Sequence, residues 1–154
     1  MSLSIFFIAW SQRPAGFVYL HGEPSTGKTY LAVCTLRRFA WSYRSPIRYV
    51  GHDLAARIRE DLDSQFAGKF VRDLSGLKGL LLIDDLGTEG LKDLTREQIA
   101  RIVYARYDNL YPTLITSNHN LAWVATNIDQ RVADRILESD QVKQYLGPNR
   151  RIKP

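Results

Sequence analysis

Short apolar runs recur along the chain, and longer stretches between them carry apolar residues at every third or fourth position. The short runs predict β-strands, and the longer stretches predict amphipathic helices. We expect strands at 17–21, 47–50, 80–83, 113–117 and 142–146. We expect helices at 28–43, 53–66, 95–109 and 128–139, with a shorter one around 70–74. Alternation of strands and helices predicts an α/β fold, in which helices cover both faces of a parallel sheet.

The helix expected at 95–109 carries its own start signal. Thr95 and Gln98 form a capping-box pattern, which predicts that the helix begins there. The residues expected on the buried face of this helix are Ile99, Ile102, Val103 and Leu110.

A length of 154 residues fits a single domain, and 45% hydrophobic with 24% charged residues is an ordinary globular composition. We expect a core domain at 16–154 and an N-terminal extension at 1–15. The apolar stretch 5–10 is too short to span a bilayer, so we expect no membrane attachment. Packing of this stretch against the domain is favoured over binding to a partner.

Cys34 is the only cysteine of the chain, which excludes an intramolecular disulfide. We interpret it as a small core residue of the helix expected at 28–43. Because neither paired cysteines nor an export signal is present, the expected location is cytoplasmic.

The chain has 21 basic and 16 acidic residues, which gives a net charge of +5. An excess of basic residues permits binding to nucleic acid, but here it is spread along the chain and is weak evidence. Candidate contacts to single-stranded DNA are Arg37, Arg38, Arg44 and Arg48, although solvated helix and strand ends are the favoured explanation for them.

The segment 22–29 reads GEPSTGKT and fits the P-loop pattern GxxxxGK(S/T) between an expected strand and an expected helix. Its glycines let backbone N–H groups turn towards phosphates, Lys28 can reach the β and γ oxygens, and the Thr29 hydroxyl is a Mg²⁺ ligand. The alternative is a tight turn followed by a solvated lysine. The predicted nucleotide-binding residues are Gly22, Glu23, Pro24, Ser25, Thr26, Gly27, Lys28, Thr29 and Tyr30.

Four aliphatic residues at 80–83 lead directly into Asp84 and Asp85, as expected of a buried strand that ends in a Walker B motif. In such a site Asp84 binds Mg²⁺ and Asp85 orients or deprotonates the water that attacks the γ-phosphate. Successive strand residues point to opposite sides, which would separate the two roles. The alternative is an acidic turn after a core strand.

The strand expected at 113–117 is followed by Asn118, which we expect beside the γ-phosphate. An asparagine amide can donate to the phosphate and accept from the attacking water. The alternative is an ordinary turn-forming asparagine.

Arg131 and Arg135 lie four residues apart and should share one face of the last helix. One interpretation is that they act as arginine fingers on the nucleotide of a neighbouring subunit. The other is a surface helix in which Arg131 pairs with Asp134, and Arg135 with Glu138.

With these motifs together, the chain resembles the AAA+ ATPases, and among them the DnaC/IstB-like group of helicase loaders and transposition helper proteins. The phrases GEPSTGKTYLAVCTL, LLLIDDLGTEGL, YARYDNLYPTLITSN and RVADRILES carry the likeness. The resemblance implies a P-loop NTPase fold, a three-layer α/β/α sandwich with a five-stranded parallel sheet and no or a vestigial helical lid. It also implies ATP or ADP and Mg²⁺ as ligands.

By the same resemblance, Asn118 is the sensor 1 residue, Arg135 is the favoured arginine finger, and Arg131 is its less certain neighbour. The implied partners are further copies of the chain and a replicative helicase or a transposase, with single-stranded DNA as a candidate. The second Walker B acid, Asp85, is shorter than the glutamate common among AAA+ proteins, so slow hydrolysis is expected. The alternatives are a nucleotide-gated interaction module with little turnover and a small P-loop kinase.

Overall fold

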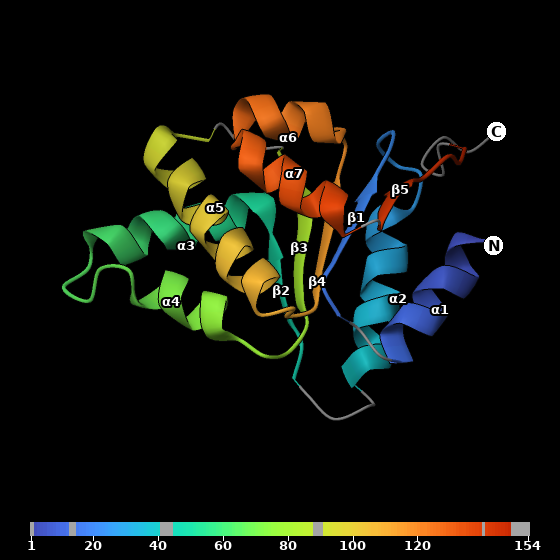
Figure 1. The fold of residues 1–154 in the computed structure, drawn as a ribbon, viewed down its shortest axis with the longest axis horizontal. Helices are drawn as coiled ribbons and strands as arrows, with labels where there is room; N and C mark the ends of the chain where they lie inside the picture. The colour runs from blue at the N-terminus through green and yellow to red at the C-terminus, as the bar shows by residue number, and fades with distance from the viewer. Residues whose placement is uncertain (1, 13–14, 41–44, 88–90, 140, 149–154) are drawn as a thin grey trace.

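The computed structural model describes residues 2–12, 15–40, 45–87, 91–139 and 141–148 (Figure 1). The strands are β1 (Phe17–His21), β2 (Ile47–Val50), β3 (Leu81–Leu86), β4 (Thr113–Ser117) and β5 (Val142–Gln144). The helices are α1 (Leu3–Gln12), α2 (Lys28–Ala40), α3 (Gly51–Asp63), α4 (Lys69–Gly76), α5 (Asp93–Asp108), α6 (Leu121–Asn127) and α7 (Gln130–Glu138).

All neighbouring strands are parallel, and the strand order across the sheet is β2-β3-β4-β1-β5. β4 therefore lies between β1 and β3, with Ser117 opposite both His21 and Leu86. Because parallel strands end at the same edge, the segments that follow β1, β3 and β4 meet there.

The strands alternate between two hydrophobic layers, as their period of two requires. On β1, Phe17 and Tyr19 belong to the larger core, whereas Val18 and Leu20 belong to the smaller one. Helices α3 to α7 contribute to the larger core, and α1 and α2 contribute to the smaller one, as the two sides of the sheet in Figure 1 show. This arrangement confirms the expected three-layer α/β/α sandwich with a five-stranded parallel sheet.

The apolar stretch at 5–10 lies in α1, which packs against α2. Phe7 and Trp10 are buried there, as expected of a packing segment, while Ile5 and Ile8 are exposed. The proposed division at residue 15 stays a prediction. Among the described helices, none combines the length and apolar character needed to cross a membrane.

The start predicted for the helix at 95–109 is wrong. α5 begins at Asp93 after the N-cap residue Lys92, which makes no side-chain cap hydrogen bond. Thr95 and Gln98 lie inside the helix and are buried, so they do not form a capping box. Leu110 follows the end of the helix with a φ of 54° and is exposed, so it also leaves the expected core stripe.

The helix predicted at 128–139 is shorter in the structure, and an unpredicted helix precedes it. Asp129 caps α7 by accepting hydrogen bonds from the backbone N–H groups of Arg131 and Val132. Asn120 caps α6 by accepting from the N–H of Trp123. Both are preferred N-cap residue types, because their side-chain oxygens satisfy amides that lack an intrahelical partner.

Cys34 is exposed, which contradicts its expected place in the core. The residues of α2 that are buried lie on a different stripe, formed by Lys28, Ala32, Thr35 and Phe39. The end of the helix predicted at 28–43 lies partly outside the described residues.

A buried arginine, Arg106, joins the connections that lead into β3 and β4. It is fully buried on α5 and donates five hydrogen bonds. Its acceptors are the backbone oxygens of Leu74, Leu77, Gly79 and Pro112 and the hydroxyl of Thr113. Burial lowers the pKa of Arg106 to about 10, so the guanidinium remains charged at neutral pH.

Candidate functional site

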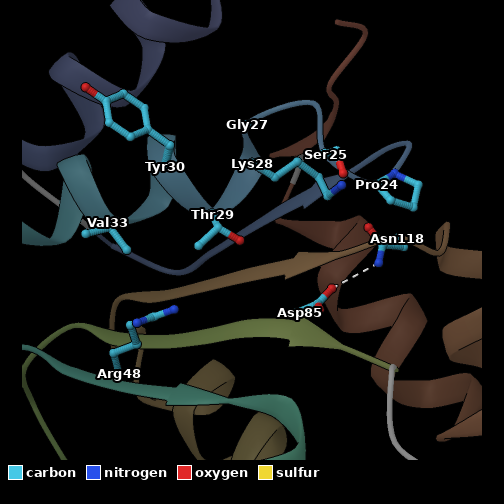
Figure 2. A pocket seen from close by; sticks show the side chains of 10 residues that line it. All are labelled: Pro24, Ser25, Gly27, Lys28, Thr29, Tyr30, Val33, Arg48, Asp85 and Asn118. Atoms are coloured by element: carbon cyan, nitrogen blue, oxygen red, sulfur yellow. Dashed lines mark hydrogen bonds between the residues drawn. The ribbon is translucent and has the colours of Figure 1, made fainter. Parts of the chain in front are cut away.

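The P-loop connects β1 to α2 and opens onto a cavity of about 750 Å³. Gly22, Ser25 and Gly27 all have positive φ values, of 152°, 63° and 112°. Positive φ values are easy for glycine and uncommon for serine, so the loop is held in a tight turn by its surroundings. Figure 2 shows the lining residues Pro24, Ser25, Gly27, Lys28, Thr29, Tyr30, Val33, Arg48, Asp85 and Asn118.

Lys28 is buried, with 6% of its surface exposed, and its ammonium lies inside the loop. Nζ donates to the backbone oxygens of Gly22 at 2.8 Å and Glu23 at 2.7 Å. Burial lowers the pKa of Lys28, while the negative charges of Asp85, Glu23 and Asp84 act in the opposite direction. The only positive charge of the loop is therefore concentrated where phosphate oxygens would meet it.

A second feature besides the tight turn requires glycine at position 22. The chain after β5 lies against the loop, and a Cβ atom at Gly22 would overlap with the backbone oxygen of Tyr145. The Tyr145 N–H also donates to the His21 backbone oxygen at 2.6 Å. The C-terminal segment is thus packed directly against the start of the P-loop.

Asp84 lies on β3 with only 1% of its surface exposed, and it does not itself line the cavity but contacts two residues that do, Thr29 and Arg48. Its Oδ1 accepts from the hydroxyls of Thr29 at 3.0 Å and Thr116 at 2.7 Å. Its Oδ2 accepts from Arg48 Nη2 at 2.5 Å. A carboxylate beside a hydroxyl supplies the hard oxygen ligands that Mg²⁺ prefers, so Asp84 and Thr29 fit this ion.

Asp85 and Asn118 meet at the carboxyl edge of the sheet. Asn118 Nδ2 donates to Asp85 Oδ1 at 3.0 Å, and both residues line the cavity (Figure 2). Asp85 has a φ of 59°, and the register of β3 against β4 shifts between Ile83 and Leu86. The regular alternation expected for the two acids is therefore interrupted at Asp85.

Arg131 and Arg135 do not line this cavity. They line a separate one of about 420 Å³ between α5 and α7, together with Tyr104 and Glu138. Arg135 Nη1 donates to Glu138 Oε2 at 3.0 Å, as the surface-helix interpretation predicted. The expected partner of Arg131, Asp134, accepts a hydrogen bond from Gln130 instead.

Arg135 also lies over the ring of Tyr107, 5.0 Å from its centroid. The Tyr107 hydroxyl donates to Glu138 at 2.6 Å. The hydrogen bond from Tyr107 has the largest effect in lowering the pKa of Glu138, and the hydrogen bond from Arg135 has the second largest. The guanidinium is therefore oriented at the surface by an aromatic ring and a carboxylate.

Two residues in contact with Asp84 were not predicted as part of the site, Arg48 and Thr116. Arg48 had been considered only as a DNA contact. Of the other three candidate DNA contacts, Arg37 and Arg38 are exposed on α2, and Arg44 lies outside the described residues. The sequence signal that could have placed Thr116 in the site is the segment TSN, in which Thr116 lies two positions before Asn118. Both contacts depend on the order of the strands, which local patterns do not contain.

Residues 4–143 match the protein family described as IstB-like ATP binding protein. The crystal structure of the DnaC helicase loader has a TM-score of 0.79 and 26% identity, covering 96% of this chain and 92% of that one. The structure of DnaI has a TM-score of 0.76 and 21% identity, covering 92% and 80%. No match was found among curated proteins.

A replication initiator, DnaA, bound to AMPPCP and single-stranded DNA has a TM-score of 0.81 and 18% identity. The match covers 93% of this chain and 45% of that one, so this chain spans less than half the length of DnaA. At this identity the likeness concerns the fold.

Proposed function

The chain belongs to the family of IstB-like ATP-binding proteins and is an AAA+ protein of the DnaC/IstB-like group, and we propose that it binds and hydrolyses ATP. We further propose that ATP drives its assembly with other copies of itself. The assembly would act in DNA replication, by loading a helicase, or in transposition.

The observation that supports hydrolysis is the convergence of three side chains on one cavity. Lys28 follows β1, Asp85 lies in the irregular end of β3, and Asn118 follows β4. A cation, a carboxylate and an amide at one edge of a parallel sheet match the needs of phosphoryl transfer to water. An interaction module that only binds nucleotide has no requirement for the Asp85 and Asn118 pair.

Each residue has a distinct task in this proposal. Lys28 binds the β and γ phosphate oxygens, and the loop amides bind the α and β phosphates. Thr29 and Asp84 would hold Mg²⁺, which neutralises phosphate charge when bound. Asp85 orients the attacking water and takes up its proton, and the Asn118 amide donates to the γ-phosphate. The products are ADP and inorganic phosphate.

We propose assembly because Arg135, on α7, lines a separate cavity and does not line the P-loop cavity of its own chain. It lies half-exposed over Tyr107 and is available to a second copy. An arginine donated to a neighbouring γ-phosphate would make turnover depend on protein concentration. Arg131, one turn earlier and exposed, is the proposed second contact.

The partners are proposed from the relatives. DnaC, at 26% identity over nearly the whole chain, is described as a helicase loader, which favours a replicative helicase. A transposase is the other proposed partner, because the chain belongs to the IstB-like family and resembles transposition helper proteins. Single-stranded DNA is a further proposed partner, because the DnaA complex that contains it shares the fold of this chain at 18% identity.

ATP hydrolysis by the purified chain tests this proposal, measured over a range of protein concentrations with and without single-stranded DNA. Turnover per subunit should rise with concentration. Lys28→Ala should weaken nucleotide binding at least tenfold, and Asp85→Asn should lower turnover roughly 100-fold without weakening binding. Arg135→Ala should lower turnover on the order of 10³-fold and leave binding unchanged.

Arg101→Ala is the control, because Arg101 is an exposed arginine on α5 outside both cavities. Binding without phosphate release at every concentration would refute hydrolysis and favour the nucleotide-gated interaction module. Transfer of phosphate to an acceptor other than water would favour the kinase alternative.

A further inference from the structure

We propose that Thr116 is a positioning residue that holds both acids of the site in their working orientations through one hydroxyl group. This inference rests on the proposed function, because it concerns the same nucleotide and Mg²⁺ site. Thr116 lies on β4, between the P-loop strand and the strand that carries the two acids.

The Thr116 hydroxyl makes two hydrogen bonds of opposite sense. It donates to Asp84 Oδ1 at 2.7 Å and accepts from the backbone N–H of Asp85 at 2.8 Å. A hydroxyl can do both at once because it carries one donor hydrogen and two acceptor lone pairs. Thr116 is 1% exposed, so water cannot easily take over either bond.

The bond to Asp84 fixes the direction of a carboxylate that faces the P-loop. Oδ1 accepts from Thr116 and from Thr29, whose hydroxyl is the other proposed Mg²⁺ ligand. Thr116 and Thr29 both hold Oδ1, and Arg48 holds Oδ2, so the carboxylate is fixed next to Thr29, which lines the cavity. Groups that orient a metal-binding carboxylate affect metal affinity although they do not touch the metal.

The bond to Asp85 supports an uncommon backbone conformation. Asp85 has a φ of 59°, which residues other than glycine seldom adopt unless their surroundings hold them. Thr116 accepts from its N–H at the point where the register of β3 and β4 shifts. The side chain of Asp85 is thereby placed against Asn118 rather than continuing the alternation of the strand.

Threonine suits this task better than its nearest replacements. Its branched side chain restricts χ1, which keeps the hydroxyl between the two acids. Valine has the same shape without the hydroxyl, and serine has the hydroxyl with a freer χ1. The pair Thr116→Val and Thr116→Ser therefore separates the hydrogen bonds from the packing.

Thr113→Val provides a matched control on the same strand. Thr113 is also fully buried, and its hydroxyl likewise accepts one bond, from Arg106 Nε at 2.8 Å, and donates another, to the Tyr111 backbone oxygen at 3.0 Å. It lies at the start of β4, whereas the site is at the end. Loss of its hydroxyl should affect stability alone.

Three quantities are measured for each variant: melting temperature, affinity for a fluorescent ATP analogue with EDTA or with increasing Mg²⁺, and turnover. For Thr116→Val we expect the half-saturating Mg²⁺ concentration to rise, and turnover to fall, about 10- to 100-fold. Affinity in EDTA should stay within about threefold, since the P-loop contacts are intact. Thr116→Ser should recover most of both losses, and Thr113→Val should change only the melting temperature.

The proposal is overturned if Thr116→Val behaves like Thr113→Val in Mg²⁺ dependence and turnover, or if Thr116→Ser is as impaired as Thr116→Val. If the unmodified chain binds nucleotide without releasing phosphate, hydrolysis is refuted, yet the Mg²⁺ dependence of binding still decides the role of Thr116. A chain that binds no nucleotide would overturn both proposals.

Discussion

Replacing Arg106 by methionine should destabilise the protein without disturbing the nucleotide site. The guanidinium joins the end of α4, the connection into β3 and the connection into β4 through five hydrogen bonds. Methionine is of similar length and apolar, so it fills much of the same space and supplies none of the donors. All five acceptors lie near the amino ends of the strands, away from the carboxyl edge that carries the site.

Two opposing effects set the size of the loss. Five hydrogen bonds at roughly 1 to 1.5 kcal/mol each amount to about 5 to 7.5 kcal/mol. Burial of the cation works in the other direction, because the lowering of the Arg106 pKa to about 10 corresponds to roughly 3 kcal/mol against the charged form. The hydrogen bonds prevail, and we expect Arg106→Met to lower the free energy of unfolding by about 2 to 4 kcal/mol.

Urea unfolding followed by circular dichroism measures this change, with Arg101→Met as the control. Arg101 lies five residues earlier on the same helix, is exposed, and donates to Gln98 Oε1 at 3.4 Å. Its replacement should change stability by less than about 0.5 kcal/mol. Affinity for ATP, measured well below the melting temperature, should be the same in all three proteins. A loss below about 1 kcal/mol for Arg106→Met would refute the reasoning.

Three further substitutions test other parts of the structure. Gly22→Ala should lower the free energy of unfolding by at least about 2 kcal/mol, because the new Cβ atom would overlap with the Tyr145 backbone oxygen. Gly76→Ala is the control: Gly76 lies in a helix with open space around it, so alanine should raise the free energy of unfolding by about 0.5 to 1 kcal/mol in the same urea assay. The hydrogen bond from Tyr104 lowers the pKa of Asp129, so Asp129 stabilises the fold above its ordinary pKa and this contribution is lost as pH falls through the lowered value. Asp129→Asn keeps a capping oxygen but cannot titrate, so between about pH 5 and pH 2 it should lose less stability than the unmodified chain. If the free energy of unfolding falls equally with pH in both proteins, Asp129 is not the group responsible.

The P-loop is the part of the site that the sequence predicted most completely. Its glycines, Lys28 and Thr29 are contiguous, and their backbone requirements are local, so the pattern contains both the residues and their geometry. Asp85 and Asn118 were predicted from the rule that parallel strands end at a common edge, and both line the cavity with Lys28. Their catalytic roles stay predictions.

Helix starts were predicted less well. The capping-box pattern at Thr95 was outweighed by burial: Thr95 and Gln98 are enclosed inside α5, whose N-cap is Lys92. Asn120 and Asp129 are typical cap residues, but Asn120 was not used as a start signal, and so α6 was missed. A cap pattern shows what a side chain can do locally, whereas tertiary packing decides where the helix begins.

The sequence by itself determined the alternating α/β layout, the two hydrophobic layers and the identity of the phosphate-binding loop, because each follows from a short-range period or a fixed spacing. Only the tertiary structure decided the contacts of Arg48 and Thr116 with Asp84, the five acceptors of Arg106 and the turned backbone of Asp85. These features join residues remote in sequence, and they depend on the order and register of strands that hydrophobic patterns leave open.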